Sequence, residues 1–201
     1  GSTVVNASIE VTEKPELKLV TNPNELRIYQ VMVSSFQDGD PSIGYTQAYG
    51  PSNALKGGDL QGIINAADYI KDLGYNGIWL MPINPSDSYH KYDVNDYYSV
   101  DKSYGTIDDL KNLIKECHKR NIKLIIDLVL NHSGKANPYF KKACVAYNKY
   151  LKGLTLTSEE EAYKDFYVFY PTAKDIPSNV TSGVVIAQIQ NNSSAAKAGL
   201  K

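Results

Sequence analysis

The sequence predicts an α/β protein in which short parallel strands alternate with helices. Three apolar runs, at residues 26–33, 76–83 and 122–130, have the length and composition of buried strands. Amphipathic segments at 60–74 and 106–121 separate them. The connections after the first two strands are long, about 26 and about 22 residues where 2 to 6 is usual, whereas the helix-to-strand returns are very short.

The first part of the chain follows this pattern from residue 26 onward. Residues 1–25 are expected to form a strand and an exposed connector, because Pro15 and the "TNPNE" cluster interrupt the alternation there. The run "LRIYQVMV" (26–33) is rich in β-branched residues and predicts a strand. In "LQGIINAADYIKDLG" (60–74) the apolar residues recur at helical spacing, and Gly74 is a predicted C-cap.

The second helix and third strand carry the clearest local signals. Thr106 is the predicted N-cap of the helix 106–121, with acids in the first turn. Cys117 lies on the apolar stripe of that helix and is predicted to be a core thiol. The run "IKLIIDLVL" (122–130) predicts a strand that would bury Asp127, which is costly unless that carboxylate is paired.

Composition excludes several classes of protein. The chain has 201 residues, 42% hydrophobic and 21% charged, which predicts a soluble globular domain. A net charge of −1 gives no electrostatic case for binding nucleic acid or an anionic membrane. No apolar run approaches the roughly 18 residues of a membrane span. Cys117 and Cys144 have no CxxC spacing and say little about redox compartment.

Strands that are apolar on both faces and alternate with helices indicate βαβ units and a parallel sheet. Crossovers in such a sheet are right-handed. An open doubly wound sheet and a closed barrel both remain possible on this pattern. Both place function beyond the carboxyl ends of the strands, which is where the long loops of this sequence lie.

Polar residues follow each of the three strands. Asp38, Asp40 and Asp59 are hard oxygen donors in a glycine-rich loop and could hold calcium, although spacing alone favours a turn built from Asp and Gly. His90 and Tyr92 lie in a tyrosine-dense loop. That loop would suit a sugar ring, or would be packed by its own tyrosines, the two interpretations being about equal.

Asn131 and His132 come directly after the third strand. A single histidine at a strand end is more often structural than catalytic. Two histidine-bearing loops at the same end of the sheet favour a site. Neutral histidine can donate to a substrate hydroxyl, and the Asn131 amide can offer an oxygen to a metal.

Taken together, the segments "IYQVMVSSFQDGD", "GGDLQGI…DYIKDLGYNGIWLMPI", "YHKYDVNDYYSVDKSYGT" and "DLVLNHS" resemble the α-amylase family, glycoside hydrolase family 13. They match in order and cover residues 26–133 almost without a gap. The first loop is most similar to the neopullulanase, maltogenic amylase and cyclodextrin glucanotransferase side of the family. The resemblance implies that 26–133 is the first part of a (β/α)8 barrel, containing its first three βα units.

The resemblance also implies roles for individual residues. Asp38, Asp40 and Asp59, with the carbonyl of Gly57, resemble a calcium site of that subgroup, which reverses the interpretation of the loop as a plain turn. Ile43 and Gly44 depart from the subgroup, where some members have side-chain amides.

Further roles fall on the other two loops. Asn131 matches a ligand of a second calcium. His90 and His132 match histidines that bond the sugar, and Tyr92 matches the tyrosine that stacks on it. Asp127 is similar to a buried aspartate that supports the strand ends.

The catalytic carboxylates of a retaining glycosidase have no counterpart in this chain. Such enzymes need two carboxyl groups about 5 to 5.5 Å apart, and in the family these follow later strands. Residues 134–201 contain no strand of the "GFRxD" kind, and the acids of "TSEEEAYKDFY" (157–167) have no strand before them. We therefore expect this chain alone to be inactive. It would need the rest of the barrel, in cis or from another chain.

Residues 134–201 are expected to begin the domain that the family inserts after strand three, "DFYVFY" leading into its small sheet. The tail 182–201 also resembles the start of a PDZ domain, and inserted-domain sequence is the favoured interpretation. The predicted function is thus that of an α-glucan glycoside hydrolase, present as an N-terminal portion. A noncatalytic glucan- or calcium-binding module and a PDZ-like peptide-binding tail are the alternatives. The family resemblance also suggests an extracellular or cell-surface location.

Overall fold

The computed structural model describes residues 19–43, 57–170 and 175. The predicted strand within 1–18, the departure at Gly44 and the tail 182–201 lie outside these residues. A 3₁₀ turn, η1 (Pro23–Glu25), leads into a parallel sheet of β1 (Ile28–Val31), β2 (Gly77–Leu80) and β3 (Lys123–Ile126). Its order β1-β2-β3 is the one expected of consecutive βα units.

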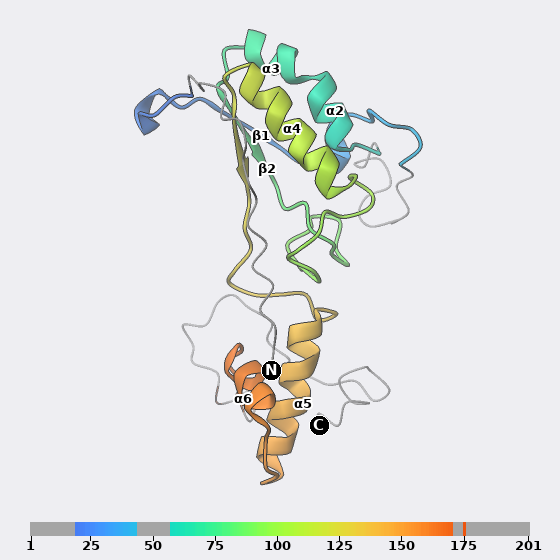
Figure 1. Ribbon diagram of the computed structural model, residues 1–201, viewed down its shortest axis with the longest axis vertical. Coiled ribbons are helices and arrows are strands. Elements are labelled where there is room, and N and C mark those ends of the chain that lie inside the picture. The colour runs from blue at the N-terminus through green and yellow to red at the C-terminus, as the bar shows by residue number, and fades with distance from the viewer. Residues whose placement is uncertain (1–18, 44–56, 171–174, 176–201) are drawn as a thin grey trace.

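Helices connect the strands in the predicted alternation. The short α1 (Val33–Phe36) follows β1, and α2 (Leu60–Asn65) and α3 (Ala67–Asp72) precede β2. The helix α4 (Ile107–Lys119) precedes β3, and α5 (Pro138–Leu151) and α6 (Ser158–Asp165) follow it. Figure 1 shows α2, α3 and α4 gathered beside the sheet, with α5 and α6 at the opposite end of the molecule.

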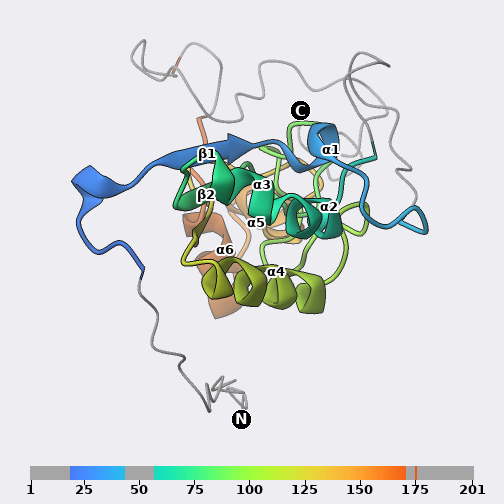
Figure 2. The same ribbon diagram turned by 90° about the horizontal axis from the view of Figure 1, so that it is seen from above.

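One face of the sheet is buried under helices α2–α4. The register aligns Tyr29 with Ile78 and Leu124, and Val31 with Leu80, so these side chains project from the same face. They pack with residues of α2, α3 and α4 into one hydrophobic core. Seen from above, these helices lie side by side along the sheet (Figure 2). The other face is less well covered, and Ile28 is 39% exposed there.

Several local predictions are confirmed. The Thr106 hydroxyl accepts a hydrogen bond from the Asp109 N–H, and the Asp109 carboxylate accepts one from the Thr106 N–H, forming a capping box. Gly74, at φ +89°, follows the end of α3. Cys117 is fully buried in the core, where desolvation raises the pKa of its thiol to about 12.

Two boundary predictions are wrong. The predicted helix 60–74 is interrupted at Ala66, whose φ of −94° and ψ of 0° leave helical geometry, so α2 and α3 are separate. The predicted strand 122–130 ends at Ile126. Leu128 and Leu130 beyond it are 62% and 75% exposed. Asp127 therefore lies just past the strand and is half-buried instead of lying within it.

The helical hairpin of α5 and α6 is joined to the loop after β2 by specific contacts. Gly134 donates its N–H to the carbonyl of Val94, and Asn137 donates its side-chain N–H to the same oxygen. A Cβ on Gly134 would lie 2.6 Å from the backbone carbonyl oxygen of Asp93, so only glycine allows this approach. Ser133 and Tyr167 share a hydroxyl hydrogen bond of 2.8 Å. None of the described helices is long and apolar enough to cross a bilayer.

Candidate sugar-binding site at the strand ends

The loop after β2 is held down by a buried ion pair. Lys91 is fully buried with φ +65°, an uncommon conformation for a residue with a side chain. Its Nζ lies 2.7 Å from Asp101 Oδ2 and 5.4 Å from the centre of the Tyr104 ring. Burial alone would raise the pKa of Asp101, but hydrogen bonds from Lys91 and Ser103 outweigh it and lower that pKa.

This anchored lysine lies between the two predicted sugar-binding residues of the loop. The Tyr92 N–H donates to His90 Nδ1 at 3.2 Å, which makes Nδ1 an acceptor and places the proton of the neutral ring on Nε2. Ser88 Oγ lies 3.2 Å from the same nitrogen. The His90 and Tyr92 ring centres are 5.8 Å apart. The structure therefore brings these two predicted residues together.

Asp127 supports Tyr92 from the end of β3. The Tyr92 hydroxyl donates to Asp127 Oδ2 at 2.7 Å. This bond, with desolvation and the carboxylate charge, raises the pKa of the Tyr92 phenol. The sequence indicates that Asp127 needs a partner but does not identify Tyr92 as that partner, because the two residues lie 35 positions apart. Asp127 thus connects the ends of two neighbouring strands.

His132 is positioned by a different tyrosine of the same loop. Its backbone carbonyl accepts a hydrogen bond of 2.9 Å from the Tyr97 hydroxyl. Its Nδ1 is buried and has no hydrogen-bond partner among the described residues. A buried nitrogen of this kind is costly unless a ligand or water satisfies it. Asn131, beside it, is exposed.

The structure places four of the predicted calcium ligands, Asp38, Asp40, Gly57 and Asp59, in the connection that follows β1. Asp59 is fully buried and caps α2. Its Oδ1 accepts the Gly62 N–H at 2.7 Å, and its Oδ2 accepts the Asp40 N–H at 2.8 Å. An added Cβ on Gly57 would lie 3.6 Å from Asp38 Oδ2.

The hydrogen bonds of this loop leave the calcium role open. Asp40 accepts hydrogen bonds from the Ser42 hydroxyl and N–H, which lower its pKa. Both Asp59 oxygens serve the loop backbone, as the turn interpretation expects. In the part of the chain that the structure describes, no three His, Cys, Asp or Glu side chains converge as metal ligands. The loop 44–56 lies outside it, so the calcium site stays a prediction.

Comparison with known proteins identifies relatives of this architecture. Residues 30–186 match the family described as "Alpha amylase, catalytic domain". "Alpha-amylase 3" of Dictyoglomus thermophilum is 40% identical over 142 residues, which are 71% of this chain and 26% of that protein. A cyclomaltodextrinase of Thermoanaerobacter pseudethanolicus is 41% identical over 116 residues, 55% of this chain and 20% of that protein.

Solved structures agree with these sequence matches. "Eubacterium rectale Amy13B" superposes with a TM-score of 0.56 and 47% identity, covering 70% of this chain and 24% of that one. A maltogenic amylase from S. marinus gives a TM-score of 0.54 at 38% identity, covering 58% of this chain and 18% of that one. The chain spans about a quarter or less of the length of these relatives.

We expect the Lys91–Asp101 pair to control the order of the loop that carries His90 and Tyr92. Lys91→Met would leave a buried unpaired carboxylate, a change that costs about 3 to 5 kcal/mol. Amide hydrogen exchange across residues 88–104 should become faster, because the destabilised loop opens more often. The double variant Lys91→Met/Asp101→Leu removes both charges and should recover most of the protection.

The matched control is the exposed pair Lys111–Asp108, 2.8 Å apart. Lys111→Met should leave exchange in α4 almost unchanged, because solvent screens an exposed pair. If Lys91→Met left the exchange of 88–104 unchanged, or if the double variant were no better than the single one, the anchoring role would be wrong.

The Tyr92 phenol should titrate above an ordinary tyrosine. Its raised pKa means that the folded state holds this proton more tightly than the unfolded state does. The contribution to stability is therefore complete below about pH 10 and is lost as pH rises through the folded pKa. NMR titration of ¹³Cζ-labelled tyrosine measures the pKa of the Tyr92 phenol. The Tyr92 signal is assigned as the one that is missing in Tyr92→Phe.

Asp127→Asn should bring this pKa down toward about 10, because the amide carries no charge. Asp108→Asn, on the exposed face of α4, should leave it unchanged. A Tyr92 pKa that is the same before and after Asp127→Asn would contradict the contact.

Proposed function

This chain belongs to the α-amylase catalytic-domain family, and we propose that it is the sugar-binding front part of a retaining α-glucan glycoside hydrolase. The observation that carries the proposal is the cluster of His90, Tyr92 and Asp127 at the ends of β2 and β3. A ring face fixed by a hydrogen bond at its hydroxyl, beside an imidazole that donates from Nε2, suits a pyranose with its apolar face and hydroxyl rim.

In this proposal each residue has a separate task. Tyr92 stacks on the sugar, and His90 donates to a sugar hydroxyl through Nε2. His132 forms a further hydrogen bond with the sugar through its imidazole. Asp127 keeps the Tyr92 ring in place and does not take part in bond cleavage. The three strands would be the first three of a (β/α)8 barrel, and α5 and α6 would begin the inserted domain.

Calcium is proposed as the cofactor, with Asp38, Asp40, Asp59 and the Gly57 carbonyl at one site and Asn131 at a second. The donor set supports this proposal, since calcium prefers carboxylate and carbonyl oxygens from a flexible loop. In the loop after β1, the backbone N–H of Asp40 bonds Asp59 Oδ2, which brings the backbone of one proposed ligand to the carboxylate of another. Bound there, the ion would brace the loop after β1 and the entry to the inserted domain.

The nucleophile and the acid/base of the retaining reaction are proposed to lie outside this chain. Glu159, Glu160 and Glu161 begin α6, at the far end of the molecule from the sheet (Figure 1). The Glu160 carboxylate completes the capping box with Thr157 and bonds Lys149. These glutamates therefore have structural partners. They do not lie at the end of a strand, where the proposal places the catalytic carboxylates.

The test is release of reducing sugar from soluble starch by the 201-residue chain, with calcium and then with chelator. We expect no activity in either condition. Restoration of strands four to eight should give hydrolysis that falls after Tyr92→Ala. Calcium-dependent hydrolysis by the chain alone would contradict the placement of the carboxylates.

Calcium binding can be measured without activity. Calcium at about 100 times its dissociation constant should stabilise the folded chain by about 2.7 kcal/mol. Asp38→Asn should remove the part of this effect that comes from the site after β1, and the exposed control Asp108→Asn should retain the whole effect. Equal stabilisation of both variants, or none of the unsubstituted chain, would remove calcium from the proposal.

A further inference from the structure

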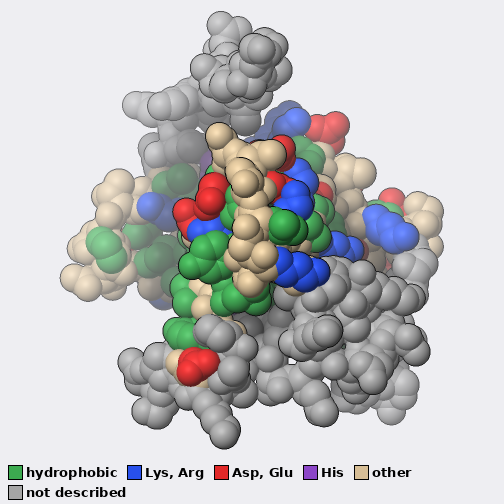
Figure 3. Space-filling view, turned by 90° about the horizontal axis from the view of Figure 1, so that it is seen from below, with side chains coloured by type: hydrophobic (Ala, Val, Ile, Leu, Met, Phe, Trp, Pro, Cys, Tyr) green, Lys and Arg blue, Asp and Glu red, His purple; other side chains and the backbone are tan. Residues whose placement is uncertain are grey.

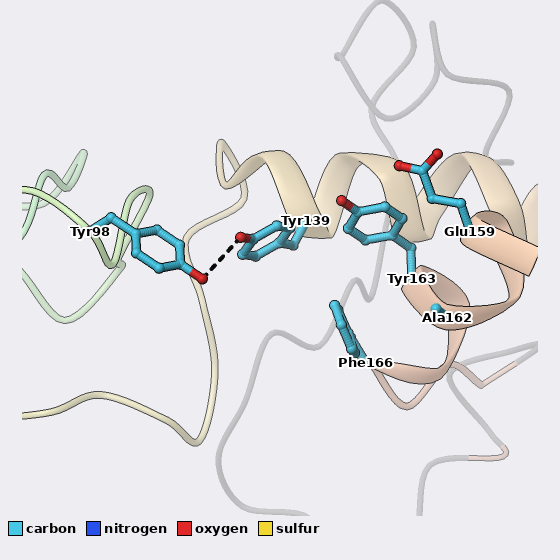
Figure 4. A pocket seen from close by; sticks show the side chains of 6 residues that line it. All are labelled: Tyr98, Tyr139, Glu159, Ala162, Tyr163 and Phe166. Carbon is cyan, nitrogen blue, oxygen red and sulfur yellow. Dashed lines mark hydrogen bonds between the residues drawn. The ribbon is translucent and has the colours of Figure 1, made fainter. Parts of the chain in front are cut away.

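A hollow lies away from the strand ends, between the loop after β2 and the α5–α6 hairpin. Its volume is about 380 Å³, within the range of about 300 to 1,000 Å³ usual for small-molecule sites. None of His90, Tyr92 and His132 lines it. Figure 4 shows its six lining residues, which are Tyr98, Tyr139, Glu159, Ala162, Tyr163 and Phe166.

Aromatic rings form most of this hollow. Tyr139 and Tyr163 stack with centres 5.7 Å apart and planes at 28°. Phe166 meets both edge-on, at 6.1 Å and 5.7 Å. Phe166 is 63% exposed and Tyr98 77% exposed. The cluster is thus ordered by its own contacts while ring surface stays open to solvent, as in a binding site and unlike isolated exposed apolar residues.

Polar groups surround the rings, and Glu159, the charged residue that lines this hollow, is paired with Lys142. The Tyr139 hydroxyl donates to the Tyr98 hydroxyl at 3.2 Å. Lys142 Nζ bonds Glu159 at 3.2 Å and the Tyr163 hydroxyl at 3.0 Å. Because the lysine and the carboxylate neutralise each other, the rim suits a neutral ligand rich in hydroxyls better than an ion. Figure 3 shows hydrophobic, basic and acidic side chains close together at this end of the molecule.

A neighbouring hollow, with a volume of about 320 Å³, shares Glu159 and Tyr163 with the first. Its other lining residues are Lys141, Lys142, Val145 and Glu160. Two adjoining hollows that share a tyrosine and a carboxylate accommodate an extended chain of sugar rings better than a single compact molecule.

We propose that this aromatic hollow is a second carbohydrate-binding site, which takes a neutral α-glucan chain independently of the site at the strand ends. Pyranose rings lie on the open surfaces of Tyr98 and Phe166, and their hydroxyls bond the tyrosine hydroxyls and Glu159. The choice of an α-glucan as the sugar rests on the proposed function, whereas the geometry of the hollow is independent of that function.

The experiment is native electrophoresis of the 201-residue chain in gels with and without amylopectin. Tyr98→Ala and Phe166→Ala each remove one exposed ring and should weaken retardation about five- to tenfold. Tyr98→Phe keeps the ring and should lose less. The matched control is Tyr69→Ala on α3, at the other end of the molecule, where the tyrosine is 58% exposed. Far-UV circular dichroism checks that each variant keeps its helices, and only variants that do so are compared.

The outcomes separate this proposal from the proposed function. Tyr92→Ala removes the ring at the strand ends. If only Tyr98→Ala and Phe166→Ala lose retardation, the hollow binds glucan and the strand-end role fails. If only Tyr92→Ala loses it, the hollow is not a glucan site and the proposed function stands. Absence of retardation in the unsubstituted chain, or an equal loss in Tyr69→Ala, overturns the second site.

Discussion

The parallel pairing of β2 with both of its neighbours is the constraint on which the rest of the structure depends. Leu80, at the end of β2, aligns with Val31 on one side and with Ile126 on the other. The three strands consequently end at the same edge of the sheet. The loops that follow them leave from that edge together, which allows Tyr92 of one loop to contact Asp127 at the start of the next.

A common edge alone would not fix side chains on so long a loop. The buried Lys91–Asp101 pair supplies that second constraint, because it anchors the residue between His90 and Tyr92 to the core. Burying an ion pair adds little net stability compared with apolar packing, but breaking one partner is costly. Such a pair therefore favours one arrangement of the loop, and the proposed sugar site depends on that arrangement more than on extra stability.

The sequence could predict what depends on neighbours along the chain. Thr106, Gly74 and Cys117 could be identified because caps and apolar stripes are local patterns. The sequence places the end of β3 too late because "DLVL" continues the apolar run, and only the absence of a pairing strand beyond Ile126 in the described residues ends it. The burial of Lys91 cannot be predicted from the sequence for a related reason. Lysine usually lies at the surface, and its burial depends on Asp101 and Tyr104 from the far part of the loop.

The aromatic hollow also could not be predicted from the sequence, because its residues are far apart along the chain. Tyr98 lies in the loop after β2, whereas Tyr139 and Phe166 belong to the α5–α6 hairpin, 41 positions or more further along the chain. The sequence shows an unusual number of tyrosines, but not which of them share a surface. The hydrogen bond from the Gly134 N–H to the Val94 carbonyl, 2.8 Å long, ties the start of the hairpin to the loop, so a backbone approach that only glycine allows also helps to assemble this hollow. If both proposals hold, one loop presents sugar-binding rings on two sides: Tyr92 toward the strand ends, and Tyr98 toward the hairpin.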